Sequence, residues 1–422
     1  MKKLIVFIFL IIYSSGFSQE VESLTLTDCY KLVKENFPLA KKSALLAKIS
    51  DLKIKNIDAT KYPEVDLKVL GTLQSDNISL QLPIPHAEAI DLPLYKGQAY
   101  LDAKYTIYDG GIREARKRME VAGLQSDQQN VEVELEKLRA QVNQQFLGIH
   151  LLQAKYEILK NVKADLQERV ATLNAGKKHG VVLPVAIQKL EVEILRLDAK
   201  LTETKGAEMT LRKVLGKLLD ISITENTQLI LPENMEISTT EKCNRPELNY
   251  FQLQKDRITA VNQLLDAKRK FKVGAFLKAG VGYPNPVNFF DDGVAPYAIG
   301  GVQLSWNILD WKKTDREKEI ITIQNEIVEQ QKESFLRNIS VQDEKYLADI
   351  EKIQRLIEND KKITKLQEKI KTGVEAQLKN GIITATEYLT EVNKVTQAKL
   401  NRKIHELQLL QLKLDYLTNN GM

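Results

Sequence analysis

Apolar and polar residues alternate in two pairs of segments, one pair in each half of the chain. In the first half the alternation includes Val65, Leu67 and Val69 and then residues 99–107, and in the second half it covers residues 271–281 and 298–308. A period of two is typical of a strand with one apolar face. The connectors within each pair are rich in proline, which predicts loops. The sequence thus predicts four strands, each close to the roughly 9–11 residues that cross an outer-membrane barrel.

A helical pattern of about 65 residues follows the second strand of each pair and then turns back on itself. Apolar residues recur at sevens in the returning segments, for example at Leu190 and Leu197, and at Leu407 and Leu414. Such spacing predicts coiled-coil packing of paired helices. At 1.5 Å per residue the long helix would reach roughly 100 Å. Shorter helical patterns at 27–60 and 246–270 precede the strands.

Three short motifs occur twice, which predicts an internal duplication. The distance from Asp109 to Gly180 is 71 residues, and the distance from Asp310 to Gly381 is also 71. We therefore divide the chain into a first repeat at 19–220, a connector at 221–242 and a second repeat at 243–422. The paired motifs are Asn36–Leu39 with Asn244–Leu248, Ile107–Gly111 with Ile308–Trp311, and Gly180–Val182 with Gly381–Ile383.

The junction and turn residues have the chemistry that ends and begins helices. Asp109 and Asp310 are expected to accept hydrogen bonds from unpaired backbone N–H groups at the start of the long helices. The glycines Gly110 and Gly111 would let the chain change direction there. At the far turns, Pro184 suits a first helical position. The run from Thr384 to Glu387 predicts a capping box.

The first 18 residues are predicted to be a secretory signal peptide. Two lysines precede an apolar run from Leu4 to Tyr13, and small residues follow. That run is too short to span a bilayer, which takes about 20 residues. Without Lys2 and Lys3, 59 basic residues face 56 acidic ones, so the formal charge falls from +5 to +3. A net charge this close to zero does not indicate nucleic acid as a partner.

No residue pattern indicates catalysis, a cofactor or a metal. The four histidines are scattered and form no metal-binding motif. Cys29 and Cys243 lie far apart in the sequence, and the alternatives are one disulfide or two separate thiols. We therefore expect a protein that is not an enzyme.

With these motifs in place, the mature chain resembles the TolC-like outer-membrane factors of Gram-negative efflux and type I secretion systems. The resemblance implies a mostly α fold with membrane β structure, in which three chains share a twelve-stranded β-barrel. Long coiled-coil hairpins would continue it as an α-barrel in the periplasm. Four strands alone cannot close a barrel, because the smallest closed forms have eight. The implied partners are two further copies of the chain, outer-membrane lipid, a periplasmic adaptor (membrane fusion) protein and an inner-membrane pump.

The resemblance also assigns roles to residues at the helix tips. It implies that the tips dock the adaptor and that the channel closes there. The docking residues would be Gly180, Val181 and Val182 in the first repeat, and Gly381, Ile382 and Ile383 in the second. It places Glu387 in an acidic ring that narrows the closed entrance, although the same residue completes the predicted capping box. Thr390 stands where the family often has a second acid, which puts a double ring in doubt.

Two functions of different classes remain open from the sequence. The first is an outer-membrane exit duct that passively conducts whatever a pump delivers. The alternative is a periplasmic coiled-coil structural or adaptor protein that forms no channel. The alternative requires the protein to be found in the soluble periplasmic fraction. The transported substrate is not encoded in any motif.

Overall fold

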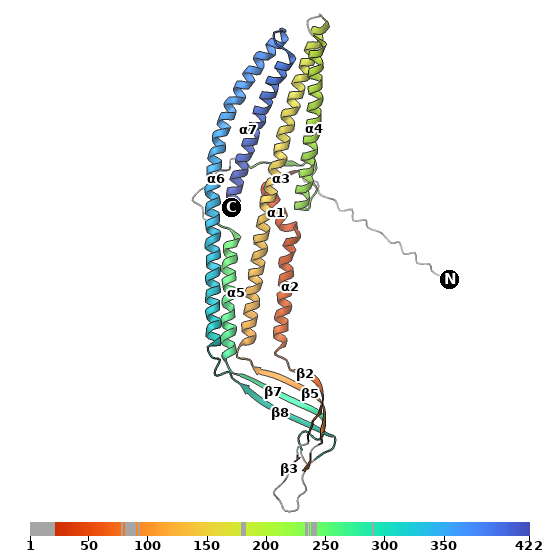
Figure 1. The fold of residues 1–422 in the computed structure, drawn as a ribbon, viewed down its shortest axis with the longest axis vertical. Coiled ribbons are helices and arrows are strands. Elements are labelled where there is room, and N and C mark those ends of the chain that lie inside the picture. The colour runs from red at the N-terminus through yellow and green to blue at the C-terminus, as the bar shows by residue number, and fades with distance from the viewer. Residues whose placement is uncertain are drawn as a thin grey trace, which may run out of the picture. The chain divides into compact units, whose positions relative to one another are not determined.

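A computed structural model of the 422-residue chain describes residues 22–76, 79–80, 90–91, 93–178, 183–232, 235, 237, 243–288 and 291–422. The predicted signal peptide and the residues Gly180, Val181 and Val182 lie outside this described part. Both halves of the chain follow the same order of main elements: one or two shorter helices, two long strands, a long helix and a returning helix. The fold thus has the duplicated, mostly helical architecture that the sequence predicts (Figure 1).

In the first half, the strands and the long helix lie close to their predicted positions. The elements are β1 (Ser23–Thr25), α1 (Leu26–Asn36), α2 (Pro38–Ala59), β2 (Glu64–Leu73), β3 (Ser79–Leu80), β4 (Ile90–Asp91), β5 (Tyr95–Tyr108), α3 (Ile112–Lys178) and α4 (Pro184–Leu219). One prediction was wrong in detail, because the helix expected over 27–60 is two helices. The break falls at Phe37, since Pro38 disfavours the helical conformation in the residue before it.

The second half repeats this order after a short strand, β6 (Gln228–Ile230), in the connector. Its elements are α5 (Pro246–Arg269), β7 (Lys272–Tyr283), β8 (Ala295–Ser305), α6 (Lys313–Lys379) and α7 (Ala385–Asn419). Both long helices contain 67 residues, close to the predicted 65. The alternation predicts that the last strand continues to Ile308, but β8 ends at Ser305.

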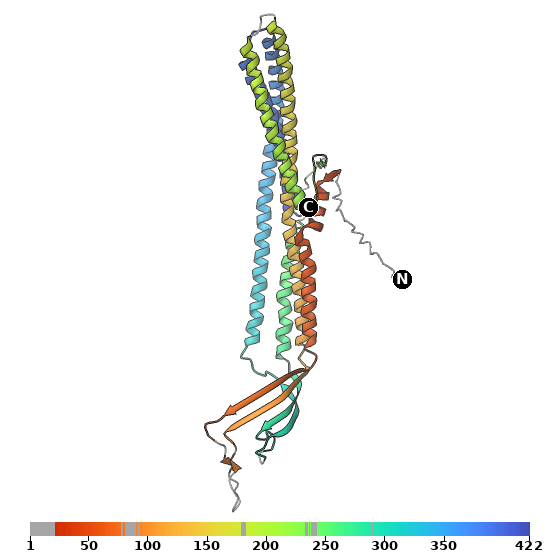
Figure 2. The same cartoon turned by 90° about the vertical axis from the view of Figure 1, so that its right-hand side faces the viewer.

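The four long strands form one antiparallel sheet in the order β2-β5-β7-β8. The central pair joins the two repeats, with Asp102 opposite Lys278 and Tyr100 opposite Gly280. Within the described residues, β2 and β8 each have a neighbouring long strand on one side alone. Figure 1 shows the four strands side by side, and Figure 2 shows the same sheet after a turn of 90°. The sheet therefore has two edges with backbone groups still able to pair.

The chain forms two compact units that do not coincide with the two repeats. One comprises residues 42–131 and 247–335, and we call it the sheet unit because it holds the four long strands. The other comprises residues 1–41, 132–246 and 336–422, and we call it the hairpin unit. Each unit takes segments from both repeats.

The hairpin unit contains two apolar cores. In the first, α1 and the parallel pair of β1 with β6 pack against α3, α4 and α7 around Cys29, Phe146 and Leu215. Cys29 and Cys243 are both free thiols, so the structure favours the second of the two alternatives for them. Burial of Cys29 raises the pKa of its thiol to about 12.

The second core lies where α3 with α4 approaches α6 with α7. Its buried residues include Leu190 and Leu197, which the spacing of seven had placed on one helix face. Leu166 and Tyr388 are fully buried beside them. Two ion pairs, Arg169 with Glu375 and Lys371 with Asp165, connect α3 to α6. The predicted helical hairpins are therefore packed against each other by an apolar seam with charged flanks.

Candidate functional site

One face of the four-stranded sheet is apolar and exposed. Leu67, Val69 and Val302 are 72%, 77% and 71% exposed. The register places Leu67 opposite Leu101 and Val69 opposite Ala99, so apolar side chains gather on one side of the sheet. A soluble sheet would cover such a face with helices or leave it polar. This surface is suited to contact with lipid or another apolar phase.

Aromatic residues gather at the ends of the strands. Tyr108 and Phe271, at one end, have ring centroids 5.0 Å apart. Tyr95 and Tyr283, toward the other end, stack at 5.2 Å. In each pair one ring comes from β5, and the other comes from β7 or from the residue just before it. Such girdles are typical of strands that end at a membrane interface.

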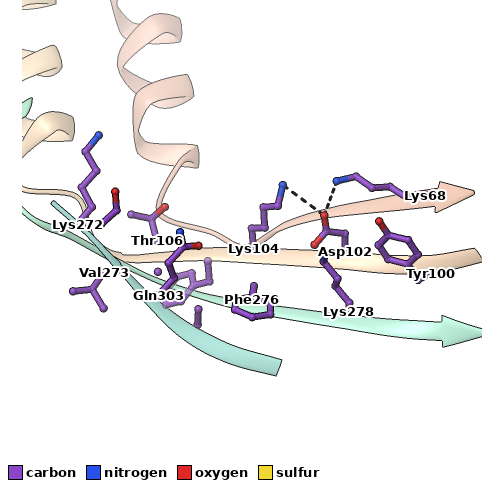
Figure 3. A pocket seen from close by; sticks show the side chains of 14 residues that line it. Lys68, Tyr100, Asp102, Lys104, Thr106, Lys272, Val273, Phe276, Lys278 and Gln303 are labelled. Atoms are coloured by element: carbon purple, nitrogen blue, oxygen red, sulfur yellow. Dashed lines mark hydrogen bonds and ion pairs between the residues drawn. The ribbon is translucent and has the colours of Figure 1, made fainter. Parts of the chain in front are cut away.

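The opposite face of the sheet is polar and rich in lysine. Asp102 is only 2% exposed, and its Oδ2 lies 2.5 Å from the Nζ of Lys68 and 3.5 Å from the Nζ of Lys104. Lys278 lies opposite Asp102 in the register, and its Nζ is 5.6 Å from the centre of the Tyr100 ring. These side chains line a cavity of about 580 Å³ on the sheet (Figure 3).

The first strand–helix junction is a two-residue left-handed turn bridged by Asp109. Gly110 and Gly111 have φ values of +75° and +90°, a region that favours glycine. The carboxylate of Asp109 accepts from the N–H of Gly111 at 2.9 Å and from the N–H of Arg113 at 2.8 Å. Because Arg113 is the second residue of α3, Asp109 satisfies a helix N–H from upstream of the usual capping position.

The second junction repeats this geometry with different residues. Asp310 accepts from the N–H of Lys312 at 3.1 Å and of Thr314 at 3.2 Å, and the Thr314 hydroxyl also donates to it at 2.5 Å. The left-handed positions are occupied by Trp311 at φ +53° and Lys312 at φ +61°. Neither is glycine, so this junction has strained backbone that the first avoids.

At the tip of the second repeat, Gly381 ends α6 in a left-handed conformation, with φ +72°. Its N–H donates to the Leu378 carbonyl at 3.0 Å, and the N–H of Ile382 donates to the Gln377 carbonyl at 2.9 Å. This pair of bonds is the Schellman motif, which requires a residue tolerant of positive φ after the helix. The glycine of the tip motif therefore has a definite structural role.

The two isoleucines after Gly381 have different environments. Ile382 is 70% exposed, whereas Ile383 is partly buried against the second apolar core. Of the two, Ile383 therefore has an apolar core to join. Ile382 stays a candidate for docking a partner.

Glu387 forms the predicted capping box with Thr384. Its Oε2 accepts from the Thr384 N–H at 2.8 Å, and its own N–H donates to the Thr384 hydroxyl at 3.3 Å. The backbone bond from Thr384, followed by the hydroxyl, lowers the pKa of Glu387 below its ordinary value of 4.5. Its carboxylate is exposed and ionised near neutral pH, as an electrostatic ring at a channel entrance would require.

The lysine cluster around Asp102 was missed by the sequence reasoning. Lys272 and Lys278 fall on the polar positions of the period-two pattern, which was an available signal. Their neighbours Lys68 and Lys104 come from the other repeat, and only the strand register brings them together.

The described residues contain neither a membrane-spanning helix nor a cluster of metal ligands. No helix among them is both long enough and apolar enough to cross a membrane. In the same part of the chain, no three His, Cys, Asp or Glu side chains are grouped so that they could hold a metal ion.

The chain matches no protein-family model and no curated protein sequence. Solved structures of outer-membrane proteins do match it. The outer membrane protein VceC from Vibrio cholerae aligns with a TM-score of 0.64 at 12% identity, over 94% of this chain and 96% of VceC. The Campylobacter jejuni CmeC outer membrane channel aligns with a TM-score of 0.63 at 13% identity, over 94% of this chain and 85% of CmeC.

The open-state MtrE outer membrane channel of Neisseria gonorrhoeae gives the same TM-score and identity as CmeC, over 94% of this chain and 88% of MtrE. The resemblance to TolC-like outer-membrane factors is thereby confirmed at the level of the fold. It covers nearly the whole chain, strands and helices together.

Proposed function

We propose that the protein is an outer-membrane channel of a Gram-negative bacterium, formed by three copies of the chain. The observation that carries this proposal is the four-stranded sheet, with its exposed apolar face, its polar face and its two unpaired edges. In a bilayer every backbone polar group needs a partner, so an open sheet is excluded there. Edge β2 of one copy would therefore pair with edge β8 of the next.

Three copies supply twelve strands, which exceeds the minimum of eight for a closed barrel. The apolar face would contact lipid and the polar face would line the lumen. The long helices would continue the wall into the periplasm. The likeness of the whole chain to the outer-membrane channels CmeC and MtrE supports this arrangement.

The direct test combines fractionation with conductance. We expect the protein in detergent-extracted outer membrane, as a cross-linked trimer that forms ion-conducting pores in planar bilayers. Recovery in the soluble periplasmic fraction, with no conductance, would instead support the coiled-coil alternative.

A matched pair of variants tests which sheet face contacts lipid. Leu67→Lys would put a charge on the apolar face, at a cost of about 2–4 kcal/mol if it lies near the bilayer midplane. Thr72→Lys is the control, because Thr72 shares the polar face of β2 with Lys68. Leu67→Lys should reduce the yield of membrane-inserted trimer, and Thr72→Lys should not. Equal yields would contradict the assignment of the two faces.

We infer further that the channel is the exit duct of a tripartite efflux or type I secretion system. In this function the tips at Gly180–Val182 and Gly381–Ile383 bind a periplasmic adaptor that links them to an inner-membrane pump. Exposure of Ile382 supports this role, since solvent-exposed apolar residues often mark interaction sites. Ile382→Asp should leave the trimer intact but abolish transport in cells, while Ile382→Val should transport normally. Normal transport by Ile382→Asp would exclude this residue from docking.

Glu387 is proposed to gate the periplasmic entrance as well as to cap α7. Threefold symmetry would bring three such carboxylates together and favour cations at that end of the pore. Glu387→Gln can still complete the capping box, so assembly should be unchanged. Block by multivalent cations added from the periplasmic side should weaken. If block by multivalent cations were unchanged, Glu387 would act only as a helix cap.

A further inference from the structure

The polar face of the sheet carries more positive charge than its one buried carboxylate compensates. Four lysines line the cavity, Lys68, Lys104, Lys272 and Lys278, against a single acid, Asp102. Three positive charges per chain are therefore left over among the lining residues. Outside the lining residues, Asp66 also forms an ion pair with Lys68, with 4.0 Å between its Oδ2 and the lysine Nζ.

The four lysines fall into two pairs, which differ in whether they form ion pairs. Lys68 and Lys104 are both held by Asp102, as the dashed lines in Figure 3 show. Lys272 and Lys278 form no ion pair with any residue that the structure describes. Within the described part of the chain, the ammonium group of Lys278 lies over the Tyr100 ring, and Lys272 is exposed. These two lysines have ammonium groups available to a ligand.

The cavity also offers neutral donors beside the lysines. The hydroxyls of Tyr100, Thr106 and Ser305 and the amide of Gln303 belong to its lining. A site that combines ammonium groups with neutral donors is suited to an anion with several oxygens. An excess of one charge sign on the walls of a cleft raises the local concentration of counter-ions.

We propose that this cavity binds small anions bearing carboxylate or phosphate groups, and that it makes the membrane-embedded part of the channel select for anions. The inference rests on the proposed function, because only a shared barrel would place this face in a lumen. Three copies would then surround the pathway with the same lysines. Rings of lysine are one of the ways by which pores select anions. The lysines attract anions, whereas Glu387 at the tip attracts cations. The two sites would therefore favour permeating ions of opposite charge.

The test is the reversal potential of the reconstituted full-length protein in a potassium chloride gradient. We expect chloride to permeate better than potassium in the parent protein. The double variant Lys272→Gln/Lys278→Gln should lower the chloride-to-potassium permeability ratio by about fivefold. That change corresponds to about 1 kcal/mol, the interaction of two unit charges 4 Å apart in water. Asp102→Asn, which removes the compensating charge, should raise the ratio.

The matched control is Lys268→Gln/Lys270→Gln, which removes the same charge from exposed residues at the end of α5, outside the cavity. It should leave the ratio unchanged. Pyrophosphate and citrate serve as probes for the two anion chemistries, and either should block chloride current in the parent but not in the Lys272/Lys278 double variant. Block by pyrophosphate alone would assign the cavity to phosphate groups, and block by citrate alone to carboxylates.

The outcomes separate the two levels of inference. Absence of any conductance would contradict the proposed channel itself. Conductance with cation preference, or an anion preference that survives in the double variant, would overturn the anion site while leaving the channel in place. Trimer formation by each variant, checked by cross-linking, shows that a changed ratio does not come from misfolding.

Discussion

The two strand–helix junctions of this protein have the same backbone and different side chains. Both begin with an aspartate whose carboxylate accepts from the N–H groups two and four residues later. In the first the intervening left-handed residues are glycines, and in the second they are Trp311 and Lys312. The aspartate is thus the element that both junctions share, and the second junction shows that this backbone geometry can form without glycine.

The reason for the difference lies in the surroundings of the two turns. A Cβ on Gly110 would lie 2.7 Å from the Ala267 carbonyl oxygen, so no side chain fits there. Trp311 is exposed and meets no such restriction. The first junction is crowded and the second is open. We conclude that crowding requires glycine at one of the four left-handed positions. At the other three, a side chain costs only the strain of the left-handed backbone.

The largest effect should come from filling the crowded position. Gly110→Ala combines the clash with Ala267 and a left-handed alanine, and should lower the free energy of unfolding by about 3 kcal/mol or more. Gly111→Ala is the control, because its Cβ would meet nothing within 4 Å. It should cost only the strain, about 1–2 kcal/mol. Thermal unfolding of the two variants measures the difference, and equal losses would show that crowding is unimportant.

The shared aspartates should have the next largest effect. Asp109→Ala removes two hydrogen bonds from the start of α3 and should cost about 1 kcal/mol, as loss of a helix cap does. Asp310→Ala should act in the same direction at α6. If either variant unfolded like the parent, the carboxylate would not be the element that holds its junction.

The same aspartate makes a prediction about pH. Burial alone would raise the pKa of Asp109, but hydrogen bonds from the N–H groups of Arg113 and Gly111 outweigh it, so the pKa lies below its ordinary 3.8. A lowered carboxyl pKa adds stability above pH 3.8, and this stability is lost as pH falls through the folded-state value. The difference between the parent and Asp109→Ala should therefore be constant at neutral pH and shrink below about pH 4. A difference that persisted at pH 2 would point to packing instead of charge.

Much of this fold could be predicted from periodicity, and the limits are physical. The period of two located all four long strands, and the repeat spacing gave two long helices of equal length. The lysine cluster was not predicted, since Lys68 and Lys278 reach the same cavity only through the β2–β5 and β5–β7 registers, which periodicity does not encode. Left-handed Trp311 and Lys312 were not predicted either, because their residue types disfavour that conformation.

Helix starts at the two tips give a second comparison between the repeats. Thr384 caps α7 through its side chain, but Leu183, at the equivalent position before α4, forms no side-chain cap. Both residues have extended backbone, with φ −81° and −72°. Leu183→Thr should therefore stabilise the start of α4 by about 0.5–1 kcal/mol, and Thr384→Ala should weaken α7 by about 1 kcal/mol.

Adding Ala186→Glu to Leu183→Thr would reproduce the complete capping box of the second repeat. Hydrogen exchange of the first-turn amides of α4 measures the gain at the site itself. Protection that did not rise in the double variant would mean that the two tips differ in backbone geometry as well as in side chains.

The smallest effect should come from relieving the strain at the open junction. Lys312→Gly exchanges a left-handed lysine for the residue that the first junction uses at this position. Removing the strain should gain about 1 kcal/mol, and the greater freedom of glycine in the unfolded chain should take back roughly half of it. The expected net gain is about 0.5 kcal/mol in chemical unfolding. Lys313→Gly is the control. Lys313 is the first residue of α6, so glycine there should change stability only through its low helix propensity. A loss of stability in Lys312→Gly would show that the lysine side chain contributes more than its backbone strain costs, and the two junctions would then be stabilised by different contacts.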